Sequence, residues 1–209
     1  MLTRTHHAAP DSATAAARED DPPDRGLDHL AIAARDGDSV AFDELYAVCA
    51  PAVYRYCYAR TRNAADAEDL LQQTFLRVVE ALPRYEDRGV PFRAWLFRIC
   101  RTVTIDAHRR RRTQFPLEEM DDVAGPTGNA AGEAGWMLAD VLDAIEHLTD
   151  DQRLVIQLRF FADLSARDAG IAMGRDEAAV RALQGRAIAS LRRHLGVVAA
   201  PILAGAAVA

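Results

Sequence analysis

Residues Pro91 to Arg112, PFRAWLFRICRTVTIDAHRRRR, form the segment that decides the fold of this chain. At about 100° per residue, the segment predicts one amphipathic helix with an apolar stripe and an arginine stripe. The apolar stripe comprises Phe92, Trp95, Leu96, Ile99, Cys100 and Val103, and the opposite arc carries Arg93, Arg98, Arg101 and Arg109. One side is expected to pack on a domain while the other faces a polyanion. An ordinary solvated helix face is the plainer alternative.

Charge alternates in blocks along the chain. The whole chain has 209 residues, is 50% hydrophobic and carries a net charge of −6, which argues against indiscriminate polyanion binding. From Arg84 to Arg112, nine arginines outweigh three acids, giving +6. From Pro116 to Asp151 there are ten acids and no basic residue, giving −10. The positive charge is therefore concentrated on the arginine segment, and attraction between the two blocks could hold the chain in a closed state.

The sequence predicts an all-α protein with two helical domains. Three helices are expected before the arginine helix, at Leu27 to Arg35, Val40 to Arg62 and Ala65 to Leu82. Asp38 or Ser39 can cap the second, and Pro83 stops the third. The apolar side of the second helix comprises Phe42, Leu45, Tyr46, Val53, Tyr56 and Cys57. The third helix is expected to bury Leu71, Phe75, Val78, Val79 and Leu82.

A second helical block, about Trp136 to Leu195, carries a helix-turn-helix pattern. Thr149 is expected to open a helix that runs through Phe161, with Gln152 completing a capping box. A short helix from Ser165 ends at Gly174, and a longer one follows from Asp176 to Leu195. The small residues Ala169 and Gly170 would allow a close crossing. Arginine and glutamine on the longer helix can read base edges in the major groove, whereas an ordinary helical hairpin is the alternative.

These motifs together resemble the extracytoplasmic-function group of bacterial sigma factors, within the sigma-70 family. The segment from Asp66 to Phe75 is similar to the family's region 2.2, and Phe92 to Arg101 is similar to region 2.4. LeuSer at 164–165, MetGly at 173–174 and ValArgAlaLeuGln at 180–184 resemble region 4.2. The resemblance places region 2 over 27–112 and region 4 over 136–196. Composition predicts a disordered N-terminal arm over 1–26, a flexible acidic linker over 113–135 and an apolar tail over 197–209.

The resemblance implies a sigma factor that binds core RNA polymerase and recognises promoter −10 and −35 elements. The partners it implies are the β′ coiled coil and β flap of the polymerase, promoter DNA and an anti-sigma factor. The implied polymerase-binding residues are Asp66, Glu68, Asp69, Gln72, Gln73 and Leu76. The −10 element would be held by Tyr85, Arg88, Arg93, Trp95, Arg98, Arg101, Thr102, Arg109 and Arg110. The −35 element would be read by Arg175, Glu177, Arg181, Gln184 and Arg186.

Two of these assignments carry a physical qualification. The loop from Arg84 to Val90, with Tyr85, is the expected pocket for a flipped base, while the angular position of Trp95 favours core packing. The family pattern has Asn where this chain has Thr102, and it has Glu-Ile-Ala where this chain has Asp168-Ala169-Gly170. A glycine in that helix should weaken it by about 1 kcal/mol relative to alanine.

The remaining observations limit other functions. No nucleophile–base pair, phosphate loop or metal cluster stands out, so no catalytic residue, cofactor or metal is expected. Cys49, Cys57 and Cys100 form no CxxC pair and are expected to be reduced core residues of a cytoplasmic protein. A stand-alone helix-turn-helix regulator remains the alternative function. The tail, VVAAPILAGAAVA, is too short to span a bilayer; it is expected either to pack loosely or to be recognised by a protease or another partner.

Overall fold

The computed structural model describes residues 23–86, 89–114 and 133–195, and every regular element in that part of the chain is helical. The all-α prediction is therefore confirmed. The N-terminal arm before Pro23, residues 115–132 of the predicted linker and the tail from 197 lie outside the described residues. The first two and last three residues of the predicted linker, 113–114 and 133–135, are helical, as parts of α4 and α5. None of the described helices combines the length and the apolar character needed to cross a membrane.

The N-terminal domain consists of α1 (Pro23–Arg35), α2 (Ser39–Thr61), α3 (Ala64–Ala81) and α4 (Phe92–Gln114). Asp38 caps α2, as one of the two predicted candidates, because its Oδ1 accepts bonds from Val40 N at 2.9 Å and Ala41 N at 3.1 Å. Helix α1 begins four residues before its predicted start and so includes residues that were expected to be disordered. A proline in the first helical turn is compatible with that earlier start.

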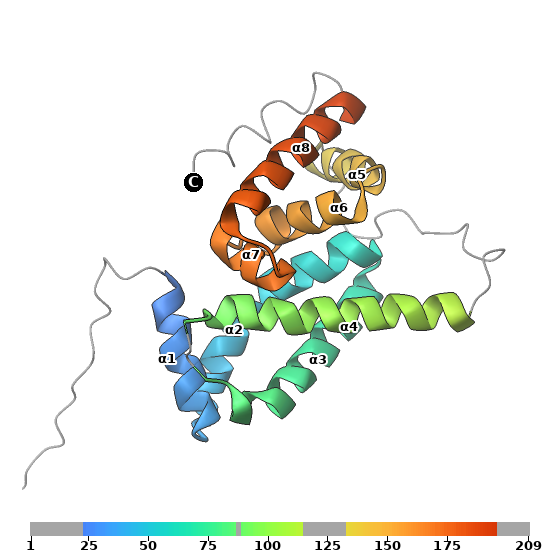
Figure 1. Ribbon diagram of the computed structural model, residues 1–209. Coiled ribbons are helices and arrows are strands. Elements are labelled where there is room, and N and C mark those ends of the chain that lie inside the picture. Colours follow the sequence, from blue (N-terminus) through green and yellow to red (C-terminus); the bar gives the residue numbers. More distant parts are fainter. Residues whose placement is uncertain (1–22, 87–88, 115–132, 196–209) are drawn as a thin grey trace, which may run out of the picture.

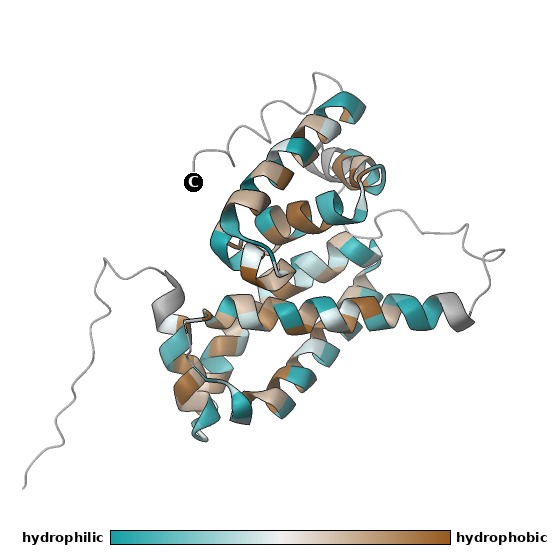
Figure 2. Ribbon diagram, viewed as in Figure 1, coloured by the Kyte–Doolittle hydropathy of each residue, from teal (hydrophilic) through white to brown (hydrophobic). Residues whose placement is uncertain are grey.

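The core of this domain is built largely from the predicted apolar faces. Leu45, Val53, Tyr56 and Cys57 on α2 are buried, as are Phe75 and Val78 on α3. On α4 the buried residues are Phe92, Leu96, Phe97, Cys100 and Val103. The prediction that Val79 is buried is wrong, because Val79 is 52% exposed, and Tyr46, on the predicted apolar side of α2, is 41% exposed. The Tyr46 ring instead covers Phe75, with ring centroids 4.6 Å apart. Figure 2 shows the hydrophilic end of α4, which extends past the other helices.

The C-terminal domain consists of α5 (Glu133–Glu146), α6 (Asp150–Ile156), α7 (Ala166–Met173) and α8 (Glu177–Leu195). The predicted capping box is confirmed, since Thr149 Oγ1 and Gln152 Oε1 each accept a bond from the other residue's backbone N–H. The helical path continues to Phe161, as predicted, but the last five residues, Gln157–Phe161, form a π-helical turn. Such turns are frequent at functional positions.

The helix-turn-helix is formed by α7 and α8. Ser165 caps α7, and Gly174 ends it in the left-handed conformation with φ 70°. Asp176 caps α8 by accepting a bond from Ala179 N at 2.6 Å. The expected close approach at Gly170 is present, although it is made with the turn: a Cβ on Gly170 would lie 2.6 Å from Arg175 O.

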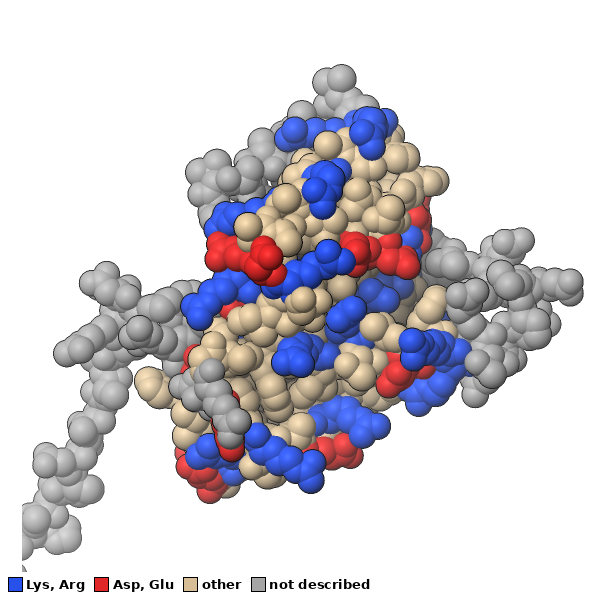
Figure 3. Space-filling view, viewed as in Figure 1, with Lys and Arg blue, Asp and Glu red and all other residues tan. Residues whose placement is uncertain are grey.

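The two domains pack against each other in two layers (Figure 1). The contact joins α4 to α7, and α2 to the π-helical turn. On the face seen in Figure 3, arginine side chains gather along the boundary between the layers, with acidic groups just above it. The boundary therefore brings the arginine helix of one domain directly beneath the helix-turn-helix of the other.

Candidate nucleic-acid and polymerase interfaces

The arginine stripe of α4 divides between two environments. Arg98, Thr102 and Arg109 are exposed, whereas Arg93 and Arg101 are half-buried. Arg93 Nη2 donates to Ala162 O of the C-terminal domain at 3.1 Å. Arg101 Nε is buried with no hydrogen-bond partner. Two of the expected −10 residues therefore lie in or beside the domain boundary instead of facing solvent.

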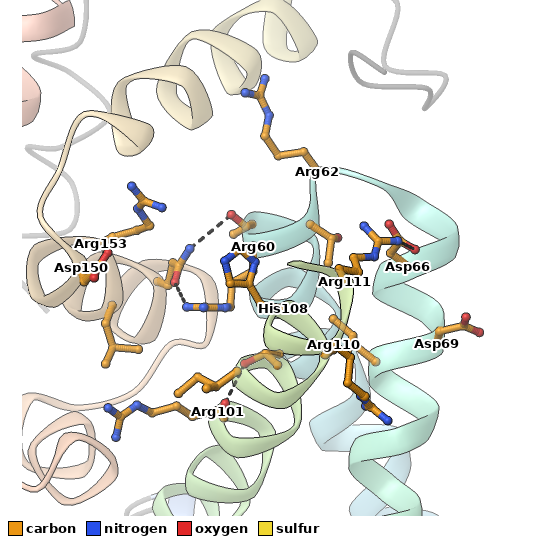
Figure 4. Close-up of a pocket in the computed structure, with 18 of the residues that line it drawn as sticks. Arg60, Arg62, Asp66, Asp69, Arg101, His108, Arg110, Arg111, Asp150 and Arg153 are labelled. Carbon is orange, nitrogen blue, oxygen red and sulfur yellow. Dashed lines mark hydrogen bonds and ion pairs between the residues drawn. The ribbon is translucent and has the colours of Figure 1, made fainter. Parts of the chain in front are cut away.

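The last turns of α4 contact α3. Arg110 Nη2 donates to Gln73 Oε1 at 3.3 Å, and Arg111 forms an ion pair with Asp66. Figure 4 shows Arg110 and Arg111 directed toward α3, away from the direction of Arg101. Arg110 was expected to hold DNA, and Asp66 and Gln73 to bind polymerase. The structure instead joins these two expected sites through direct contacts.

Tyr85 does not form a base pocket in this structure. Its side chain is 2% exposed, and its ring packs against Phe92 and Trp95 at centroid distances of 5.6 Å and 5.1 Å. Its hydroxyl donates to Asp28 Oδ1 at 3.3 Å, and the same carboxylate accepts from Phe92 N at 2.6 Å. In this structure the ring fills the space where α1 meets the start of α4, and the assignment of Tyr85 to a base pocket stays a prediction. The half-buried Trp95 packs as its angular position predicts, and Arg88 lies outside the described residues.

Helix α3 presents a polar face with an apolar centre. Glu68, Asp69, Gln72 and Leu76 are all exposed, and Leu76 is 65% exposed. Val79 is one turn from Leu76 and is also exposed, which the sequence prediction missed by placing it in the core. An exposed leucine–valine pair surrounded by acids and amides is typical of a protein-binding surface.

The expected −35 residues lie on α8 and at its start. Arg175 forms an ion pair with Asp151 at 2.6 Å, and Arg181 pairs with Glu177 at 2.6 Å. Both arginines remain exposed, and Arg186 is exposed on the same helix. Exposed pairs of this kind contribute little to stability. The guanidinium groups can therefore leave these carboxylates and bind phosphates or base edges instead.

Arg159 supports Gln184, one of the expected −35 residues, and the sequence did not predict this role. Its Nε donates to Gln184 Oε1 at 2.9 Å, and its Nη1 donates to Leu164 O. With its oxygen occupied, the Gln184 amide can present its N–H groups outward. Burial, together with the charge of Arg181, lowers the pKa of Arg159 from its usual value. The sequence feature that could have indicated this role is the position of Arg159 between the apolar residues Leu158 and Phe160.

A cavity of about 1060 Å³ lies between the domains (Figure 4). Its wall contains residues from α2, α3, α4 and α6, including Arg60, Arg101, His108 and Arg153. Gln157 reaches across this boundary: its Oε1 accepts from Arg60 Nη1 at 3.1 Å, and its Nε2 donates to Ala59 O at 3.3 Å. Gln157 was also missed, although it stands out as one amide among Leu154, Val155, Ile156 and Leu158.

In the part of the chain that the structure describes, the three cysteines are buried thiols outside any disulfide, as predicted. Cys57 and Cys100 lie with their sulfur atoms 3.9 Å apart. The hydrogen bond between the two thiols, followed by burial, raises the pKa of Cys57. A thiol kept protonated in this way is a poor nucleophile and metal ligand. Within the described ranges, no group of three or more His, Cys, Asp or Glu side chains could hold a metal ion.

Comparison with known families matches both domains. The sigma-70 region 2 family matches residues 45–114, and the sigma-70 region 4 family matches residues 144–193. The ECF RNA polymerase sigma factor SigD of Mycobacterium tuberculosis is 36% identical over 179 residues, covering 81% of this chain and 84% of SigD. The ECF RNA polymerase sigma factor BldN of Streptomyces coelicolor is 34% identical over 175 residues, covering 78% of this chain but only 63% of BldN.

Two solved structures share the fold of this chain. CnrH, in a complex with the cytosolic domain of CnrY, has a TM-score of 0.65 and 29% identity, covering 83% of this chain and 99% of CnrH. The sigma factor RpoE of Bartonella quintana, in a complex with the anti-sigma factor NepR, shares the fold with a TM-score of 0.59 and 24% identity, covering 75% of this chain and 98% of RpoE. With regions 2 and 4 present in this order, the chain belongs to the ECF group of RNA polymerase sigma factors.

Proposed function

We propose that this alternative sigma factor binds core RNA polymerase through the exposed face of α3, holds the −10 element on α4 and reads the −35 element with α8. The observation that carries the proposal is that three helices present exposed surfaces of different chemistry. The α3 surface is acidic and amide-rich around Leu76 and Val79, the α4 surface carries arginines, and α8 belongs to a helix-turn-helix. Catalysis belongs to the polymerase and not to this chain.

The proposed polymerase contacts follow from chemistry and family membership. The α3 surface would bind the β′ coiled coil, with the apolar pair at its centre and Glu68, Asp69 and Gln72 around it. Region 4 would contact the β flap. Because promoters are read in the cytoplasm of bacteria, we place the protein there.

Regulation by an anti-sigma factor is also proposed. CnrH and RpoE were solved in complexes with CnrY and with the anti-sigma factor NepR. Membership of the same group supports an equivalent partner for this chain. A pull-down with the full chain, followed by inhibition of its transcription by the captured protein, tests this part of the proposal.

Transcription in vitro tests the function as a whole. Purified core polymerase is supplied with sheared genomic DNA of the source bacterium, with and without the sigma factor. We expect new transcripts that share upstream −35 and −10 elements. A folded chain that shifts duplex DNA by itself but adds no transcripts would contradict the proposal and favour a stand-alone regulator.

The substitution Asp69→Arg tests the polymerase surface. Asp69 is exposed on α3, so reversing its charge should abolish polymerase binding while the helical fold is retained. Binding is measured by comigration with core polymerase in size-exclusion chromatography. Glu44→Arg, at an exposed position on α2 outside the α3 surface, is the matched control. Unchanged affinity of the Asp69→Arg variant would withdraw the assigned interface.

A further inference from the structure

The cavity between the two domains has positive charges in its wall that carboxylates do not neutralise. Arg60 on α2 and Arg101 on α4 both line it, and neither forms an ion pair with any residue that the structure describes. Arg60 Nη1 donates instead to the uncharged amide of Gln157 at 3.1 Å. Figure 4 shows the side chains of Arg60 and Arg101 extending in the same direction, toward the helices of region 4.

The acidic residues of the same wall do not offset these two charges. Three of the five already form ion pairs with other arginines: Asp66, Glu146 and Asp151. Of the other two, Asp69 points away from Arg60 and Arg101 in Figure 4. Asp150 lies in the first turn of α6, where the helix dipole offsets part of its charge. The cavity therefore favours a ligand that carries negative charge.

Two guanidinium N–H groups of this wall lack a hydrogen-bond acceptor. In the described part of the chain, three buried side-chain nitrogen or oxygen atoms have no hydrogen-bond partner, and two of them are Arg101 Nε and Arg153 Nε. Both arginines line the cavity, one from region 2 and one from region 4. An unpaired buried donor on a charged group is unfavourable and rare in native proteins. An anionic ligand would supply the missing acceptors after a small adjustment of these side chains.

Part of the wall is apolar. Leu70 from α3, Ile105 from α4 and Leu154 from α6 line the same cavity as the arginines. Its volume of about 1060 Å³ lies at the upper end of the range for small-molecule sites. Inorganic phosphate would use the arginines alone. A nucleotide matches both parts of the wall, because its phosphates suit guanidinium forks and its flat base suits apolar side chains.

We propose that this cavity is a binding site for a nucleotide with two or more phosphate groups. Arg60 and Arg101 would hold the phosphates through charge-assisted hydrogen bonds, and the apolar side chains would pack against the base. The site itself does not depend on the proposed function. Its link to promoter binding does rest on that function, because Arg101 is also assigned to the −10 element.

Calorimetric titration of the full chain tests the ligand class. The probes are ADP, GDP, CDP and UDP, with AMP and pyrophosphate as partial ligands, all at one ionic strength. We expect at least one diphosphate to bind about tenfold more tightly than pyrophosphate, which lacks the base, and than AMP, which lacks the second phosphate. Absence of binding by all four diphosphates would overturn the proposal. Equal binding of pyrophosphate would also overturn it, since the site would then recognise the anion alone.

Two substitutions of opposite sign test the location of the site. Arg101→Gln should weaken binding of the diphosphate by about tenfold, because a charged donor is lost. Asp150→Asn should strengthen it by about threefold, because a nearby negative charge is removed. The matched controls are Arg77→Gln on α3 and Asp140→Asn on α5, exposed positions outside the cavity wall, and both should bind like the native chain.

Circular dichroism establishes that each variant retains its helices. If Arg77→Gln weakened binding as much as Arg101→Gln, the attraction would belong to the whole surface and the site would be overturned. Unchanged affinity of both Arg101→Gln and Asp150→Asn would overturn it as well.

Competition tests the link to the promoter. The anisotropy of a fluorescent single strand carrying the −10 sequence is measured with the chain while the diphosphate is added. We expect the strand to be displaced, because both ligands use Arg101. A strand that stayed bound at saturating diphosphate would separate the two sites and overturn the link, while the calorimetric result stood. If the chain failed to direct transcription, the proposed function would fail and the nucleotide site would remain.

Discussion

Helices α4 and α8 both present arginines for DNA, but they differ in what holds those arginines in the free chain. In the turn before α8 and on α8 itself, Arg175 and Arg181 pair with acids of their own domain, at Asp151 and Glu177. On α4, Arg93 donates to a carbonyl of the other domain. The proposed −35 surface therefore lies within one domain, whereas the proposed −10 surface includes an arginine that bonds to the other domain.

This difference indicates an order of events. A surface held by local, exposed ion pairs can exchange those pairs for phosphates at little cost. A surface that takes part in a domain boundary must first lose several hydrogen bonds that act together. Binding of polymerase at α3 offers a source of the free energy needed for that separation, and α8 needs no such preparation.

The largest expected effect comes from charge reversal on the exposed part of α4. Arg98→Glu should lower transcription by the holoenzyme at least about tenfold near 0.15 M salt, because one contact with a DNA phosphate is lost and one repulsion is added. Each of these two changes lowers the magnitude of the slope of log affinity against log salt concentration by about one. Transcript yield over a salt series provides the measurement. The loss should grow as salt falls. A loss independent of salt would show that Arg98 acts through the fold instead.

A smaller effect is expected from a single base contact on α8. Arg181→Ala should reduce discrimination at one base pair of the −35 element by about 1–3 kcal/mol. Transcription from promoters substituted at each −35 position measures it. Because Arg181 is bound only to Glu177 in the described structure, region 4 should keep its stability. An equal loss on all sequences would assign Arg181 to a phosphate.

Much of the fold could be predicted because its signals are local. Caps at Asp38, Thr149 and Asp176 are set by side chains that bond to a backbone two or three residues away. Periodicity likewise located the faces of α2 and α4, and the family resemblance placed both helices in region 2.

The remaining features depend on what lies opposite each face. Periodicity placed Val79 in the core, because an apolar residue that binds another protein can have the same helical spacing as one that packs in the core. Tyr85 was assigned to a base pocket because nothing local shows that α1 covers it with Asp28. The partner of Gln157 lies about one hundred residues earlier in the chain, so its amide could be noticed in the sequence but not interpreted.

The comparison of the two domains can be sharpened by a change confined to region 4. Gly170→Ala should lower the stability of that region, although helix propensity alone favours alanine by about 1 kcal/mol. A Cβ there would lie 2.6 Å from the backbone oxygen of Arg175, and overpacking of this kind costs about 1–3 kcal/mol. The net loss in the free energy of unfolding should reach up to about 2 kcal/mol, from these two opposing effects.

Gly185→Ala is the matched control, because a Cβ at Gly185 meets nothing within 4 Å. This exposed position on α8 should gain up to about 1 kcal/mol from propensity. Urea unfolding of both variants, followed by circular dichroism, therefore gives opposite shifts in the midpoint. A gain for both would mean that the turn yields easily at Gly170. Opposite shifts would explain why this chain has glycine where the family pattern has alanine: the turn before α8 approaches too closely for a side chain.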